Sequence, residues 1–209
     1  MNHCEKKTNE TNAKARLLEA ATALFAERGY AGTFVREIVG RAGVSKPVLY
    51  YYFRNKEGIF CTILDGAAKQ QETILAEVLA MSGTALDRLI YLYRRIYQGV
   101  MEQQHLFKLI YRLVFGARQA APDYDVEQYH RRMYDAIKAI YLDGLTRDQV
   151  READADEVAF LVVSLLDFCF HLDYVNPDSS DPERPVRLLR LAFRGLGKDN
   201  RGAMTYERI

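Results

Sequence analysis

The chain is poor in cysteine. Its three cysteines, Cys4, Cys61 and Cys169, lie far apart, with no CxxC pair and no spacing typical of a metal site. We therefore expect reduced thiols, no metal and no bound cofactor, as in a cytoplasmic protein.

Long hydrophobic runs are also missing. No uninterrupted apolar run reaches the roughly 18 residues that a membrane-spanning helix needs. The amino terminus, MNHCEKKTNETNAKA, is polar and lacks the apolar centre of a signal peptide. We expect no membrane association and a disordered arm over residues 1–10.

Catalytic motifs are absent as well. The sequence has no nucleophile–base pair, no paired carboxylates and no glycine-rich phosphate loop. An enzyme is therefore not expected, and only turnover in a broad substrate screen would revive that hypothesis.

Charge is present but unevenly distributed. The net charge is only +1, yet residues 1–60 carry ten Lys and Arg against six Asp and Glu, and the remainder is mildly acidic. A basic amino-terminal segment suggests contact with a polyanion. Such an excess also occurs in domains that bind nothing charged.

Helical periodicity dominates, and strand signals are almost absent. From about Thr11 to Arg28 the apolar residues form one stripe, and Gly29 is placed to end that helix. Further helices are predicted over 56–81, 84–103, 104–118, 122–143, 154–175 and 183–197. The fold class is therefore all-α, with about nine helices.

Two short helices follow the first one. Thr33 is a predicted N-cap for a helix that Gly43 ends, and Ser45 is the predicted N-cap of the next helix, in which Leu49 and Phe53 face inward. Two helices joined by a tight turn that contains glycine form a helix-turn-helix.

Three consecutive tyrosines lie in the third helix. Side chains separated by about 100° per residue cannot all enter one core, so Tyr50, Tyr51 and Tyr52 are predicted to face outward. The alternative is that they pack against the following helix with only their hydroxyls in water.

These residues give the chain its resemblance to a known family. The segment LLEAATALFAERGYAGTFVREIVGRAGVSKPVLYYYFRNKEGIF, residues 17–60, resembles the TetR (tetracycline repressor) family of bacterial transcriptional regulators. The matching positions are Phe25, Gly29, Tyr30, Thr33, Ile38, Ala42, Gly43, Val44, Ser45, Leu49, Tyr50, Tyr52, Phe53, Lys56 and Glu57. Two positions depart from the pattern: Pro47, where many members have a small residue, and Tyr52, where His is frequent.

The resemblance implies that the helix over 45–52 enters the major groove of DNA. Lysine can bind guanine or a phosphate, and tyrosine can bind a phosphate or pack on sugars and thymine methyls. The expected base contacts are Lys46, Pro47, Val48 and Tyr50. The expected backbone contacts are Thr33, Ser45, Tyr51, Tyr52 and Lys56.

The resemblance also implies a homodimer that binds a pseudo-palindromic operator. In the family the last two helices form the dimer, here about 154–175 and 183–197. The span Val158–Leu172 is apolar nearly all round, although it could instead be the core of a monomer. Three arginines of the last helix suggest a solvated face rather than a second DNA patch: Arg187, Arg190 and Arg194.

A small-molecule effector is implied for the carboxy-terminal helices. No basic cluster there calls for a phosphorylated effector, so an apolar or aromatic ligand fits better. The candidate pocket residues are Tyr93, Tyr97, Phe107, Tyr111, Met133, Phe168 and His171. Each could equally be ordinary core. Asp167 and His171, four residues apart, could bind the ligand or satisfy each other.

The leading hypothesis is therefore a dimeric DNA-binding regulator, a repressor controlled by a small molecule. Its helix-turn-helix domain would span residues 11–55, and an effector-binding and dimerisation domain would span 56–209. The alternative is a helical ligand-binding or protein-interaction module without specific DNA binding. The sequence leaves open the operator, the effector, the regulated genes, the direction of the ligand's effect, and whether one dimer or two bind DNA.

Overall fold

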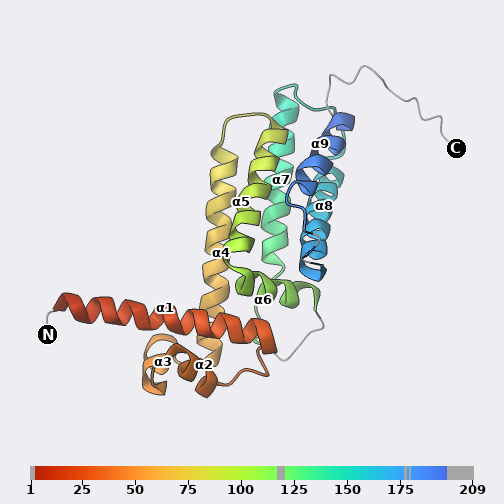
Figure 1. Ribbon diagram of the computed structural model, residues 1–209. Coiled ribbons are helices and arrows are strands. Elements are labelled where there is room, and N and C mark those ends of the chain that lie inside the picture. The colour runs from red at the N-terminus through yellow and green to blue at the C-terminus, as the bar shows by residue number, and fades with distance from the viewer. Residues whose placement is uncertain (1–2, 117–120, 177, 179, 197–209) are drawn as a thin grey trace. The chain divides into compact units, whose positions relative to one another are not determined.

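The computed structural model describes residues 3–116, 121–176, 178 and 180–196. Within these ranges the chain forms nine α-helices (Figure 1), which confirms the predicted all-α class. They are α1 (His3–Arg28), α2 (Val35–Ala42), α3 (Lys46–Phe53), α4 (Lys56–Ala80), α5 (Ala85–Glu102), α6 (Gln104–Phe115), α7 (Gln128–Thr146), α8 (Ala155–Val175) and α9 (Arg184–Leu196).

The helices form two compact units. The first unit comprises Met1–Gln70 and Val100–Glu127, and the second comprises Gln71–Gly99 and Gln128–Ile209. The helix-turn-helix therefore shares its unit with the first part of α4 and with α6. The functional division predicted after residue 55 stays a prediction.

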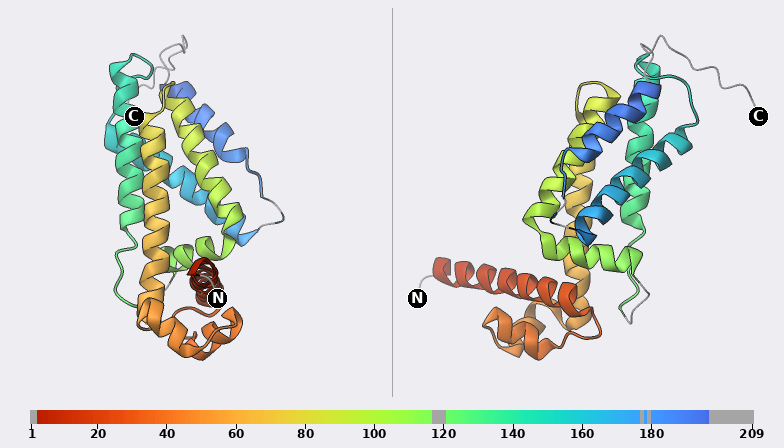
Figure 2. Two further views of the ribbon diagram at one scale, coloured as in Figure 1. Left: turned by 90° about the vertical axis from the view of Figure 1, so that its left-hand side faces the viewer. Right: turned by 45° about the vertical axis from the view of Figure 1, so that its right-hand side comes forward.

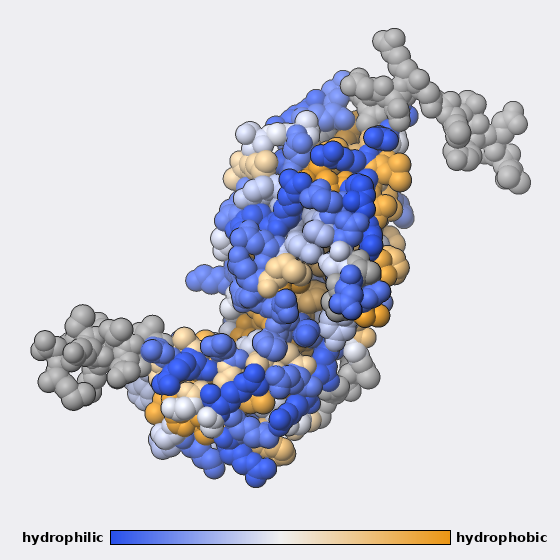
Figure 3. Space-filling view, in the orientation of Figure 1, coloured by the Kyte–Doolittle hydropathy of each residue, from blue (hydrophilic) through white to orange (hydrophobic). Residues whose placement is uncertain are grey.

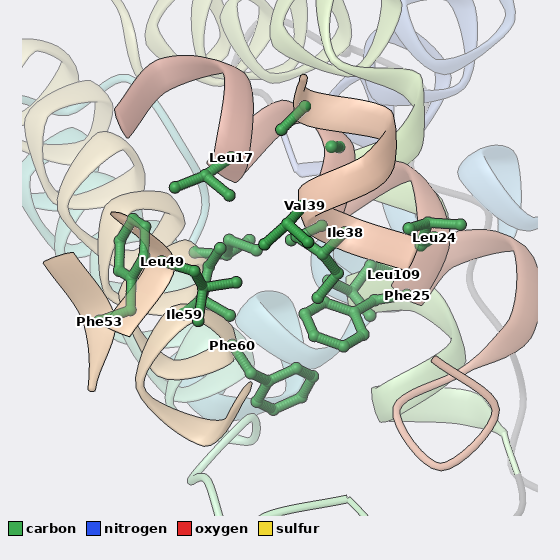
Figure 4. Close-up of a cluster of buried hydrophobic side chains, with 14 of the residues drawn as sticks. Leu17, Leu24, Phe25, Ile38, Val39, Leu49, Phe53, Ile59, Phe60 and Leu109 are labelled. Carbon is green, nitrogen blue, oxygen red and sulfur yellow. The ribbon is translucent and has the colours of Figure 1, made fainter. Parts of the chain in front are cut away.

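The core of the first unit brings together apolar residues from all its helices. In this unit α1 packs on α2, α3 and α6. Figure 4 shows Phe25 of α1, Ile38 of α2, Leu49 of α3 and Phe60 of α4 converging, and each is completely buried. The predicted apolar stripe of α1 is thus confirmed as the face that anchors the helix-turn-helix.

Local signals define the turns of this unit. Gly43 ends α2 in the left-handed conformation, with φ 62°, which glycine adopts without steric cost. Ser45 is the N-cap of α3, as predicted. Asn55 precedes α4, and its side-chain oxygen accepts a hydrogen bond from the Gly58 N–H at 2.7 Å. The carbonyl oxygen of Phe53 would lie only 1.9 Å from a Cβ at position 58, so this tight junction requires glycine.

In the second unit α8 packs on α7 and on α9 (Figure 2). Helix α8 buries one face and exposes Phe160, Leu161 and Phe168, and α9 exposes Leu191. In Figure 3 hydrophobic residues gather on the α8–α9 side of this unit. The expectation that Val158–Leu172 is buried on most sides is therefore met on one side only within a single chain.

Helix α8 also meets a length and composition test for crossing a membrane, with a mean hydropathy of 1.8 over its most apolar window, 28% of which is buried. The expectation that no segment would be long and apolar enough is therefore wrong by this test. Core helices of other proteins pass the same test, so the result is weak evidence on its own.

Three predicted boundaries differ from the structure. Helix α1 begins at His3 rather than near Thr11, because residues 3–28 contain no glycine or proline to stop it; the expected disordered arm is helical from residue 3 onward. Helix α7 begins at Gln128 rather than 122 and continues through Gly144, which was predicted to break it. A Cβ at Gly144 would lie 2.8 Å from the Ala85 Cβ, so this glycine serves close packing. The predicted helix ends at 118 and 197, and residues 1–2 of the arm, lie outside the described residues.

Candidate nucleic-acid interface

Helix α3 has a buried face and an exposed face. Leu49 is completely buried and Phe53 nearly so. On the other side Tyr50 is 47% exposed and Tyr51 76% exposed. The residues that begin this helix are also exposed: Ser45, Lys46 and Pro47. An ammonium, a hydroxyl and two phenols are thus presented together, and DNA phosphates and base edges accept such donors.

Tyr52 differs from its two neighbours because it is half-buried. It packs against the core of the first unit, and its ring lies 5.0 Å from that of Tyr51, edge to face. Val48 is also half-buried and packs against the same core. The outward orientation predicted for the triplet therefore holds fully for Tyr50 and Tyr51. For Tyr52 the alternative of packing with a wet hydroxyl fits better.

Thr33 requires a correction. Its side chain is completely buried, and its hydroxyl lies 2.8 Å from the Gly29 carbonyl oxygen and 3.1 Å from that of Leu24. The hydroxyl therefore donates to the carbonyls at the end of α1 and is not available to a phosphate. The N-cap of α2 is Phe34 and not Thr33.

Lys56 requires a similar correction. Its Nζ donates to the carbonyl oxygens of Tyr30 at 2.9 Å and Thr33 at 3.0 Å, and it lies 4.0 Å from the centre of the Tyr30 ring. Burial lowers the pKa of this ammonium. Lys56 therefore ties the start of α4 to the loop before α2, instead of extending toward a phosphate.

The start of α2 carries two surface residues that the sequence analysis missed. Phe34 is 54% exposed, and the Arg36 guanidinium lies 5.2 Å from the centre of its ring. Glu37 helps to fix this end of the helix, since its carboxylate pairs with Arg28 at 2.8 Å and accepts from the Phe34 N–H at 3.0 Å. The available signal was an apolar residue at an N-cap position, directly before a basic residue.

The seven candidate effector residues do not come together. Phe107 and Tyr111 of α6 belong to the first unit, with ring centres 5.8 Å apart. The other five belong to the second unit. The expectation that all seven line one pocket is therefore not met.

Within the second unit these residues also separate. Tyr93 is buried against Tyr97 and donates to the Pro182 carbonyl at 3.0 Å. Burial is the main cause that raises the pKa of its phenol. Phe168 and His171 are exposed on α8, and Met133 is half-buried on α7.

Asp167 does not use His171 as its printed ion-pair partner. Its carboxylate lies 3.1 Å from Nε2 of His130 on α7. The sequence analysis treated His130 as isolated, which is wrong because the packing of α7 on α8 brings the two side chains together. Among the described residues, no group of three or more His, Cys, Asp or Glu is arranged to hold a metal ion.

The first unit contains a cavity of about 870 Å³. Its walls come from the end of α1, from α4, from α6 and from residues 121–127. None of the seven candidate effector residues lines it. The signal that could have indicated it is weak in sequence, because the wall joins residues more than eighty positions apart.

Comparison with known proteins agrees with this geometry. Residues 17–61 match the family model described as bacterial regulatory proteins, tetR family. The chain is 30% identical over 121 residues to the uncharacterized HTH-type transcriptional regulator YdgC of Bacillus subtilis, which covers 56% of this chain and 62% of that protein. It is 32% identical over 98 residues to the HTH-type transcriptional repressor KstR2 of Mycobacterium tuberculosis, covering 47% of this chain and 48% of that one.

The fold also matches solved structures. The structure of a SmeT–triclosan complex has a TM-score of 0.72 to this chain, with 21% identity, and the match covers 90% of this chain and 93% of that one. At this identity the likeness shows the fold alone. The matches to the two curated relatives span about half to three fifths of their length.

Proposed function

The chain belongs to the TetR family of bacterial regulatory proteins, whose members are not enzymes, and from this premise we propose that it is a dimeric, sequence-specific DNA-binding repressor. A small molecule controls its binding to a pseudo-palindromic operator, and it acts in the cytoplasm, where bacterial DNA lies.

The observation that carries this proposal is the two-faced helix α3. Lys46, Tyr50 and Tyr51 are exposed, while Leu49 and Phe53 hold the helix on the core from behind. A rigid helix with a cation and phenols on its free face fits the major groove. The proposed DNA contacts are Ser45, Lys46, Pro47, Val48, Tyr50, Tyr51 and Tyr52. Arg36 and Phe34 at the start of α2 are added to them, and Thr33 and Lys56 are removed.

The exposed apolar face of α8 and α9 supports dimerisation. Phe160 is 64% exposed, Phe168 61% and Leu191 62%. Burial of such a side chain contributes about 1.5–3 kcal/mol, so several of them facing a second copy could hold a stable dimer. Two heads in one dimer would bind two half-sites separated by one or more helical turns of DNA.

Control by a small molecule rests on fold and on relatives. The similar SmeT structure is a complex with triclosan, a small aromatic compound. This chain also contains a cavity of a volume that suits a small organic ligand.

The test is footprinting of the intact protein on DNA upstream of its own coding region. We expect a protected pseudo-palindrome whose affinity falls steeply with salt. Lys46→Ala should weaken binding by about tenfold, or 1–3 kcal/mol for a base contact. Lys108→Ala, which removes an exposed lysine of α6 in the same unit, should leave affinity unchanged. If no DNA fragment is retained even at low salt, the chain would be the alternative ligand-binding or interaction module.

A further inference from the structure

The cavity of the first unit has an aromatic inner wall. Phe25, Tyr30 and Phe60 line it, and their ring centres lie 5.0–5.6 Å from one another. Leu109 and Leu113 of α6 add aliphatic surface. Such a wall favours a ligand with an apolar or aromatic body.

The rim of the cavity is predominantly acidic. Asp123, Asp125 and Glu127 line it and are exposed, whereas Arg112 is its one basic residue among those described. The Nη1 of Arg112 donates to the Ala26 carbonyl oxygen at 2.8 Å, so this guanidinium is engaged at the end of α1. Carboxylates raise the local concentration of cations, and aromatic faces attract them.

We propose that this cavity binds a hydrophobic organic cation. The aromatic and aliphatic wall holds the apolar body of the ligand, and the carboxylates at the rim select its charge. This site lies in the unit that contains the helix-turn-helix and is distinct from the aromatic residues that the sequence favoured. As the place of the effector, it rests on the proposed control by a small molecule.

The cavity wall also touches the support of the helix-turn-helix. The Tyr30 ring that lines it lies under the Lys56 ammonium, and the same ammonium binds the carbonyl oxygens of Tyr30 and Thr33 just before α2. An occupant that contacts Tyr30 is therefore one residue removed from the loop that leads into α2.

The test uses two ions of nearly equal shape and opposite charge, tetraphenylphosphonium and tetraphenylborate. Isothermal titration of the full chain without DNA should show one tetraphenylphosphonium bound per chain, with tetraphenylborate at least about tenfold weaker. Because DNA is absent, the result stands whatever the outcome for operator binding.

Three variants locate the site. Leu113→Trp fills the cavity and should abolish binding of the cation, whereas Lys108→Trp, the same change on the exposed side of α6, should not. Asp123→Lys reverses one charge at the exposed rim, where folding is not at stake, and should weaken the cation by about tenfold. If Leu113→Trp does not fold, Asp123→Lys decides. Equal binding of the two ions, binding of neither, or a cation affinity unchanged by Asp123→Lys would overturn the proposal.

Discussion

The role of Lys56 can be decided by removing its charge while keeping its length. Lys56→Met retains the apolar stem and deletes the ammonium that donates to the carbonyl oxygens of Tyr30 and Thr33 at 2.9 and 3.0 Å. If Lys56 is a structural brace, the variant should be less stable. If it is a phosphate contact, as the sequence suggested, the variant should instead bind DNA less tightly.

The size of the effect follows from these contacts. A hydrogen bond from a charged group contributes about 1.5–3 kcal/mol, and the cation over the Tyr30 ring adds about 0.5–1 kcal/mol. Lys56 is partly exposed, so water replaces some of the lost interaction. We expect a net loss of about 2–3 kcal/mol, a large share of the roughly 5–15 kcal/mol that holds a domain folded.

The assay is urea unfolding monitored by circular dichroism, together with operator affinity at several salt concentrations. Lys108→Met, on the exposed side of α6, is the matched control. A brace predicts lower stability and an unchanged dependence of log affinity on log salt. A fall of about 0.9 in that slope, with stability changed by less than about 0.5 kcal/mol, would refute the structural reasoning.

Two other predictions concern the second unit. Phe168→Glu places a charge on the exposed apolar face of α8 and should raise the dimer dissociation constant by more than about tenfold; sedimentation that still shows a tight dimer would rule out this face. The hydrogen bond from Tyr134 to Asp156 raises the pKa of that phenol to about 12. Its stabilising effect is therefore complete below the ordinary tyrosine pKa of about 10 and is lost as the pH rises past 12. Asp156→Asn should make one tyrosine titrate earlier by ultraviolet absorbance, and an unchanged titration would contradict this.

The helix-turn-helix was predictable because its signals are local. The apolar stripe of α1, Gly43 at the end of α2, and Leu49 and Phe53 on the inner face of α3 all depend on residues within a few positions of one another. Periodicity and capping preferences act at that range, so the sequence was sufficient.

The roles of single polar residues were not predictable in the same way. Thr33 has a hydroxyl suited to a phosphate, but its true partner, the Leu24 carbonyl, lies nine positions earlier. The partners of Lys56 lie more than twenty positions earlier. The pair of His130 and Asp167 depends on the packing of two helices. A donor that suits a phosphate also suits a carbonyl, and only tertiary structure decides between them.

The effector residues failed for a related reason. They were selected as aromatic side chains on helices predicted to surround a ligand, and a buried aromatic looks the same in sequence whether it lines a cavity or fills a core. Tyr93 is buried against Tyr97 and Phe170. The cavity is instead walled by Phe25 and Phe60, which the sequence indicated only as core.

The most direct test of the account is to ask whether the free face of α3 touches DNA. A photoreactive benzoylphenylalanine in place of Tyr51, the most exposed of the three tyrosines with a listed exposure of 76%, should crosslink to labelled operator, and unlabelled operator should compete the crosslink away. The same group in place of Lys108 should give none. Specific operator binding without a crosslink at position 51, or an equal crosslink at position 108, would contradict the claim that this helix docks on the double helix.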